Sequence, residues 1–162
     1  MTAKLVGIGV ILMAGVMLRS LLCDRRRGRL LVCEELYRFL LHIRTRISCY
    51  LDPPSRLHIG FESLTLSECG FLGGIRAGKS LLDGLEASAI PDVLSEEELH
   101  AAREVLSTVG TGYMDEQLRL LDGGIDAFSS LLVKEREACA RDVKLINTLS
   151  ASLSVGIAII LI

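Results

Sequence analysis

Residues 145–162, LINTLSASLSVGIAIILI, decide how the rest of the chain is interpreted, because they contain no charged side chain. About 18 residues in a helix span about 27 Å, which is close to the hydrocarbon thickness of a bilayer. A soluble domain has little use for a segment of this kind. The stretch therefore predicts a membrane-spanning helix over 145–162.

A second apolar segment lies near the other end of the chain. The uncharged run over 5–18 continues past Arg19 to Cys23, and the long Arg19 side chain can extend toward the interface. The run could also be the apolar part of a signal peptide, but no small-x-small cleavage site follows it. We favour a membrane helix over 4–23.

Basic residues flank both predicted spans on the side that faces the middle of the chain. DRRRGR at 24–29 follows the first span, and a charged stalk at 134–144 precedes the second. Because positive charge is retained on the cytosolic side, we expect residues 24–144 in the cytosol. Membrane lipid is then an expected partner.

Composition excludes several classes of function. The 162 residues carry a formal charge of −2, which argues against nucleic acid as a partner, since phosphate contacts require a basic surface. The five cysteines are scattered without a C-x-x-C pair, and the three histidines lie far apart. We expect no metal, no cofactor and no catalytic residue, and hence no enzyme.

Apolar residues in the middle of the chain recur with the period of an α-helix. The clearest case is 30–51, whose apolar face consists of Val32, Leu36, Phe39, Leu40, Ile43, Ile47 and Tyr50. No segment alternates convincingly with period two. The sequence predicts an all-α fold: a cytosolic bundle of six or seven helices flanked by the two transmembrane helices.

Turn and cap residues predict where these helices begin and end. The first helix should end at Pro53-Pro54, and a second should run from Ser55 to about Ser67 with Leu57, Ile59, Phe61 and Leu64 on its apolar face. After a loosened glycine stretch we expect a short helix over 79–88 and a capping box at Ser95-Glu98 that starts a helix ending at Gly110. We expect Asp115 to cap the last helix and Gly123-Gly124 to weaken or kink it.

Residues 73–80, GGIRAGKS, match the phosphate-binding pattern G-x-x-x-x-G-K-[ST] through Gly73, Gly78, Lys79 and Ser80. That chemistry requires the loop to follow a buried strand in a parallel sheet. The residues upstream form a weak strand at best, and no apolar strand ending in aspartate is available for magnesium. We therefore interpret the match as a helix junction without a nucleotide site.

The order of these features resembles the stage III sporulation protein AB family, which is similar to the cytoplasmic domain of the type II secretion platform F component. The resemblance covers nearly the whole chain and rests on six features: Lys4-Leu5-x-Gly7, the helix Arg29-Leu30 to Tyr50 ending in proline, Gly78-x-Ser80-Leu81, Val109-Gly110, Gln117, and the stalk that leads into the last span. Tyr113 stands where the family usually has aspartate, with Asp115 shifted along, and tryptophan is absent.

The resemblance implies a platform component of the channel complex between mother cell and forespore, in the outer forespore membrane. The implied partners are a cytosolic ATPase of the same sporulation operon and other membrane components of the complex. Candidate contact residues lie in two exposed turns: Gly78, Lys79, Gly110, Gly112, Tyr113, Asp115 and Gln117. The alternatives are a membrane-anchored P-loop protein, which would bind nucleotide through Lys79, and a generic helical membrane adaptor.

Overall fold

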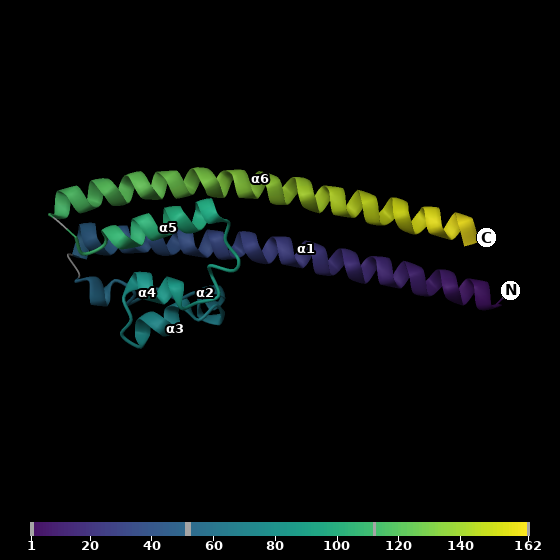
Figure 1. The fold of residues 1–162 in the computed structure, drawn as a ribbon, viewed down its shortest axis with the longest axis horizontal. Helices are drawn as coiled ribbons and strands as arrows, with labels where there is room; N and C mark the ends of the chain where they lie inside the picture. The colour runs from purple at the N-terminus through teal and green to yellow at the C-terminus, as the bar shows by residue number, and fades with distance from the viewer. Residues whose placement is uncertain (1, 51–52, 112, 162) are drawn as a thin grey trace. The chain divides into compact units, whose positions relative to one another are not determined.

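The computed structural model describes residues 2–50, 53–111 and 113–161, and over this range every regular element is helical, as predicted. For residues 2–12, 154–155 and 157–161 it describes the backbone alone. Six α-helices are present in the described residues: α1 (Thr2–Thr45), α2 (Leu64–Glu68), α3 (Phe71–Arg76), α4 (Leu81–Glu86), α5 (Glu96–Thr108) and α6 (Met114–Leu161) (Figure 1).

The chain divides into two compact units. Unit 1 comprises Met1–Gly28 and Glu135–Ile162, and unit 2 comprises Arg29–Lys134. The long helices α1 and α6 contribute to both units, whereas α2 to α5 belong to unit 2 alone.

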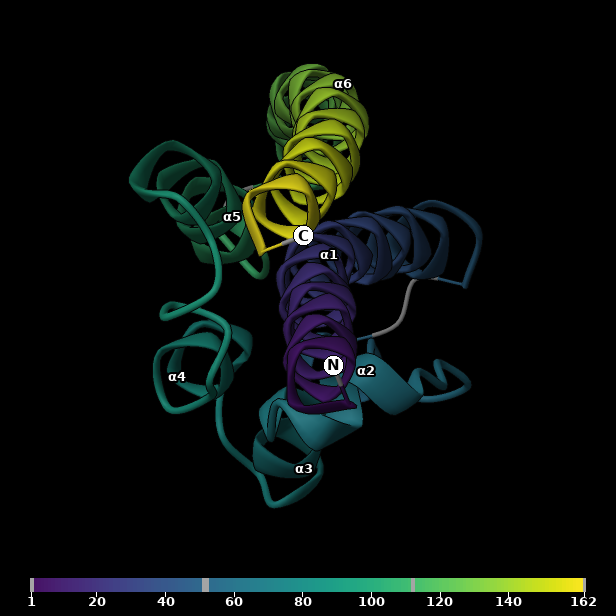
Figure 2. The same ribbon diagram turned by 90° about the vertical axis from the view of Figure 1, so that its right-hand side faces the viewer.

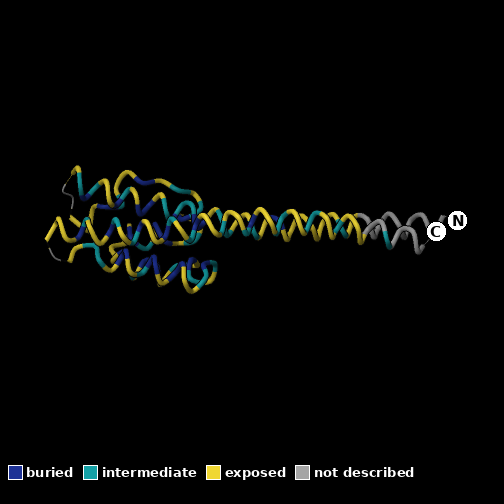
Figure 3. The backbone as a smooth tube through the Cα atoms, turned by 90° about the horizontal axis from the view of Figure 1, so that it is seen from above, coloured by how far each residue is buried: buried dark blue, intermediate teal, exposed yellow. Residues whose placement is uncertain are grey.

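The core of unit 2 forms around the apolar face of α1. Six of the seven residues predicted for this face are buried, and Tyr50 is the exception at 64% exposure. The Phe39 ring makes edge-to-face contacts with Phe61 and Phe71, both with centroids 5.1 Å apart. Such contacts add to the stabilisation from burial. The buried residues of the core cluster all belong to unit 2 and appear dark blue in Figure 3.

The predicted helix over 55–67 is wrong. A 3₁₀ turn at Pro54–Arg56 stands at its start, and α2 begins only at Leu64, after Ser63 accepts a hydrogen bond from the Leu66 N–H at 3.2 Å. Leu57 and Phe61 are buried as expected, but Ile59 and Leu64 are 49% and 77% exposed. The apolar spacing was compatible with a helix, but the cap is Ser63 and not Ser55, eight residues later than predicted.

The glycine stretch and the short helix after it also differ from expectation. Gly70, Gly73 and Gly74 were expected to mark a loosened stretch, but Gly73 and Gly74 lie within α3 and Gly70 directly precedes it. This helix buries Phe71, Leu72 and Ile75. The helix predicted over 79–88 is shorter and begins at Leu81, because Ser80 caps it by accepting from the Asp83 N–H at 3.0 Å.

The capping box at the start of α5 is confirmed. The Ser95 hydroxyl accepts from the Glu98 N–H at 3.3 Å, and the Glu98 carboxylate accepts from the Ser95 N–H at 2.7 Å. The Glu98 carboxylate also accepts from Arg29 on α1 at 3.0 Å while being 4% exposed. A buried carboxylate therefore serves both the helix end and an ion pair between α1 and α5.

One expectation about α6 is wrong, and the expected weakening or kink at Gly123-Gly124 stays a prediction. The helix starts at Met114, so Asp115 lies inside its first turn and does not precede it as a cap. Gly123 and Gly124 do not interrupt the helix. A methyl carbon at Gly124 would lie 2.4 Å from Cγ2 of Val105, so the missing side chain is what lets Val105 of α5 approach α6.

Within unit 1 the N-terminal part of α1 and the C-terminal part of α6 run side by side in opposite directions (Figures 1 and 2). Arg19 Nε donates to Asn147 Oδ1 at 2.6 Å, and Arg26 forms ion pairs with Asp142 and Glu135. Cys23 and Cys139 are buried. The described part of unit 1 therefore consists of two antiparallel helices that are linked by these side-chain hydrogen bonds and ion pairs.

Among the described residues, no helix combines the length and the apolar character needed to cross a bilayer. The predicted spans 4–23 and 145–162 include residues whose side chains lie outside the described part of the chain, namely 4–12, 154–155 and 157–162.

Candidate functional site

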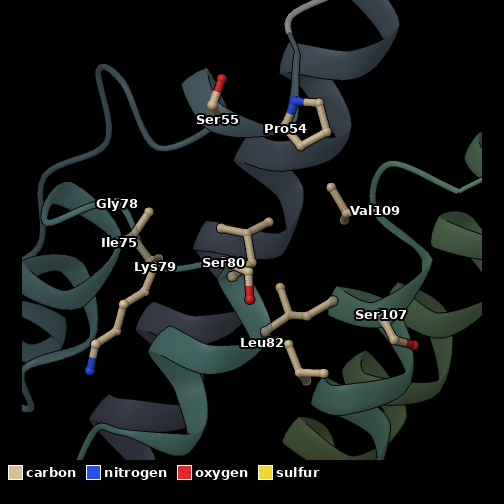
Figure 4. A pocket seen from close by; sticks show the side chains of 11 residues that line it. Pro54, Ser55, Ile75, Gly78, Lys79, Ser80, Leu82, Ser107 and Val109 are labelled. Atoms are coloured by element: carbon tan, nitrogen blue, oxygen red, sulfur yellow. The ribbon is translucent and has the colours of Figure 1, made fainter.

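A cavity of about 500 Å³ in unit 2 is lined by three segments that are far apart in the sequence. They are the turn after α1, the junction between α3 and α4, and the end of α5 (Figure 4). A volume of this size falls in the usual range for binding pockets. The lining residues are Pro54, Ser55, Ile75, Gly78, Lys79, Ser80, Leu81, Leu82, Leu106, Ser107 and Val109.

The turn after α1 and the turn after α5 meet beside the cavity. Gly110 has φ +85°, a left-handed conformation that favours glycine, and a methyl carbon there would lie 2.9 Å from Pro54 Cγ. Gly110 therefore meets two requirements, a positive φ and close contact with a proline. Together they set how the two turns fit against each other.

The junction between α3 and α4 forms another wall. The backbone N–H of Lys79 donates to Gly74 O at 3.2 Å, and that of Gly78 donates to Ile75 O at 3.0 Å. The Ser80 hydroxyl donates to Asp83 Oδ2 at 2.6 Å in addition to its role as the cap of α4. This hydroxyl is therefore engaged within the helix cap.

An ion pair holds α4 against α5. Arg103 donates to both carboxylate oxygens of Glu86, at 2.5 and 3.0 Å. The hydrogen bond from Arg103 holds the pKa of the Glu86 carboxyl below its ordinary value, and the same bond raises the pKa of Arg103. Both groups are solvent-exposed, so this pair sets the orientation of the two helices more than it adds to stability.

The cavity walls are apolar and its rim is polar. Aliphatic carbon comes mainly from six residues: Pro54, Ile75, Leu81, Leu82, Leu106 and Val109. Lys79 is exposed and makes no ion pair with a described residue, and its amine points away from the other labelled side chains in Figure 4. An apolar recess whose edge carries a lysine without an ion-pair partner among the described residues is suited to binding an apolar group that carries a negative charge nearby.

The residues of the P-loop-like pattern are distributed over different structures. Gly73 lies within α3, Gly78 adopts φ +92° in the turn, Lys79 is exposed and Ser80 caps α4. The element before the turn is α3, whereas a phosphate-binding loop follows a strand. That the match is not a nucleotide site stays an interpretation.

The structure brings together some of the predicted contact residues and separates others. Gly78 and Lys79 line the same cavity as Val109, the neighbour of Gly110, whereas Tyr113 and Asp115 are exposed at the start of α6 and do not line it. Gln117 is only 9% exposed. Gly112 lies outside the described residues.

Sequence reasoning missed Pro54, Ser55, Leu82 and Ser107 as cavity residues. No local pattern distinguishes them, because an apolar residue that lines a cavity has the same spacing as one that fills a core. The nearest signal was the combination of Pro53-Pro54 with Gly110, two turn markers that proved to be in contact.

Comparison of the chain with protein-family models, with curated proteins and with solved structures found no match.

Proposed function

We propose that this chain is a non-enzymatic scaffold, anchored at a membrane by both ends, that docks a separate cytosolic ATPase through the cavity of unit 2. The observation that carries the proposal is the cavity itself. It joins two turns, around residues 78–80 and 109–110, that the family resemblance singled out independently.

The shape and chemistry of the cavity support docking of a protein. A recess with apolar walls and an unpaired lysine at its rim can accept an apolar side chain of a partner and pair with a nearby carboxylate. The cavity walls are held by the Arg103–Glu86 ion pair and the Pro54–Gly110 contact, so the surface is formed before a partner arrives. Preformed surfaces lose less conformational entropy on binding.

The exposed apolar side chains of unit 1 support membrane anchoring. Large apolar residues with 58–68% exposure follow one another along both helices, and contiguous surfaces of this kind mark contact with a membrane or a protein. They are Met13, Val16, Met17, Leu18 and Leu21 on α1, and Leu145, Leu149 and Leu153 on α6. The basic residues at 24–29 and 134–144 favour the cytosolic side for the chain between them.

The resemblance to the stage III sporulation protein AB family supplies the partner in this proposal. The ATPase of the same sporulation operon would dock on unit 2, and the chain would connect it with other membrane components of a channel between mother cell and forespore. Fixing the chain at both ends would raise the effective concentration of these partners at the membrane.

The proposal is tested by capture of the cognate ATPase with the full chain in detergent. Ser107→Trp places a large ring at the cavity, and Ser130→Trp is the matched control. Ser130 is likewise an exposed serine that donates to a backbone carbonyl of its own helix, but it does not line the cavity. We expect capture by the original chain and by Ser130→Trp, and a loss of about tenfold or more for Ser107→Trp.

Two outcomes would contradict different parts of the proposal. If the original chain captures no ATPase, the scaffold function is wrong. If all three chains capture it equally well, the ATPase is a partner but the cavity is not where it docks.

A further inference from the structure

Unit 1 contains a second cavity, of about 220 Å³, between its two helices. Most of its lining comes from α1, between Val16 at one end and Arg27 at the other, and Asn147 of α6 closes it. The eleven helical steps from Val16 to Arg27 cover about 16 Å of helix. The cavity therefore extends along the helix pair from an apolar region to a charged one.

The polar end of the cavity has an excess of positive charge. Arg19 and Arg27 line it together with one carboxylate, that of Asp24, which accepts a hydrogen bond from Ser20 Oγ at 3.1 Å. Two guanidinium groups against one carboxylate leave one positive charge. A ligand that neutralises this cavity carries a single negative charge.

Arg27 is available to such a ligand. It is exposed, and it makes no hydrogen bond or ion pair with any residue that the structure describes, whereas Arg26 pairs with Asp142 and Glu135. Arg19 uses Nε for Asn147, so the hydrogen bond that holds the two helices together leaves its two terminal nitrogens for another acceptor.

The apolar end continues into the exposed surface of α1. Val16 is 64% exposed while lining the cavity, and Met13 is 68% exposed one turn before it. A molecule with a phosphate at one end and hydrocarbon at the other matches this gradient. Free phosphate would satisfy the arginines but would leave the apolar side chains in water.

We propose that this cavity binds the headgroup of an anionic phospholipid, with Arg27 and Arg19 donating to the phosphodiester and the acyl chains lying along Val16 and Met13. The inference rests on the membrane anchoring in the proposed function and adds a specific lipid class to it. A zwitterionic headgroup fits less well, because its net charge is zero and the excess positive charge of the two arginines over the one carboxylate would remain unneutralised.

The test uses the full chain, purified in detergent and stripped of lipid. The protein is incubated with an equimolar mixture of phosphatidylglycerol, phosphatidylcholine and phosphatidylethanolamine, recovered by affinity purification, and its retained lipid is quantified by mass spectrometry. The variant is Arg27→Gln. Arg25→Gln is the matched control, since Arg25 is an exposed arginine of the same basic segment that does not line the cavity.

We expect selective retention of phosphatidylglycerol. It should fall about fivefold in Arg27→Gln, remain in Arg25→Gln and be restored by Arg27→Lys. Excess glycerol phosphate should not displace the lipid.

Equal retention of the three lipids, equal loss in Arg25→Gln and Arg27→Gln, or displacement by glycerol phosphate would each overturn the assignment. If the chain fractionates with cell membranes but shows any of these results, the lipid site is wrong and the membrane anchoring of the proposed function stands. If the chain neither fractionates with membranes nor retains lipid, both the membrane anchoring and the lipid site are wrong.

Discussion

Gly124 illustrates how much a single position can control in this protein. It lies at the point where Val105 of α5 contacts α6, and a methyl carbon there would lie 2.4 Å from the Val105 side chain. The residue before it, Gly123, has nothing within 4 Å of the same hypothetical atom. The two glycines are adjacent in sequence but differ completely in what surrounds them.

We therefore predict opposite effects for two alanine substitutions. Gly124→Ala should lower the free energy of unfolding by about 1–3 kcal/mol through overpacking, whereas Gly123→Ala should be neutral or raise it by up to about 1 kcal/mol through helix propensity. Thermal unfolding of the full chain in detergent measures both. Val105→Ala in the Gly124→Ala background should recover part of the loss, and equal effects of the two alanines would show that the close contact is absent.

The burial of single residues was predictable where one long helix forms the centre of the core. The period of 30–51 identified six buried positions correctly, five on α1 and Ile47 in the π-helix turn Arg46–Tyr50. Tyr50, at the end of that turn, is exposed. Ile59 and Leu64 were assigned to an apolar face that the chain does not form. An apolar period predicts burial only where the helix that it assumes is actually formed.

At the scale of elements, ion pairs tie helices of unit 2 together. Arg44 on α1 donates to Asp122 on α6 at 2.5 and 3.2 Å, in the same bidentate manner as Arg103 and Glu86. The hydrogen bond from Arg44 holds the pKa of the Asp122 carboxyl below its ordinary value. A carboxyl whose folded-state pKa is depressed contributes stability above its unfolded pKa, and this contribution is lost as pH falls through the folded value.

We accordingly predict that the melting temperature of the full chain falls as pH is lowered from about 6 to about 3. Asp122→Asn and Glu86→Gln should each make the decline shallower. Because both pairs are exposed, the difference between variant and original should shrink in high salt. If the chain that carries both substitutions has the same pH profile of melting temperature as the original chain, these pairs contribute nothing measurable to stability.

Helix ends were predicted less well than helix existence, for a physical reason. The capping box at Ser95-Glu98 was identified because both of its partners lie within four residues. The start of α2 at Leu64, after the cap Ser63, and that of α6 at Met114 were missed, since several serine and aspartate residues nearby could equally have served as caps. Which of them does so depends on packing against α1.

For the whole molecule, the predicted cytosolic placement of unit 2 can be tested with cysteine chemistry, and the structure indicates which thiol to use. Cys49 is exposed, Cys139 is buried, and burial together with Glu68 raises the pKa of the Cys69 thiol and slows its reaction. We predict that a membrane-impermeant maleimide labels Cys49 after lysis of protoplasts but not before. Cys49→Ser supplies the background, and labelling of Cys49 in intact protoplasts would place unit 2 outside.

The sequence by itself determined the all-α class, the main apolar face of α1 and the start of α5, because each depends on residues within a few turns of one another. Only the tertiary structure decided that residues 54–55, 75, 78–82, 106–107 and 109 line one cavity, that Gly124 receives Val105, and that Arg27 lines a cavity beside Asn147. The physical reason is that contacts between distant segments depend on how helices pack, and many sequences with the same helical period pack differently. Residues 145–162 remain a predicted span, and Asn147 within them links α6 to α1 through Arg19.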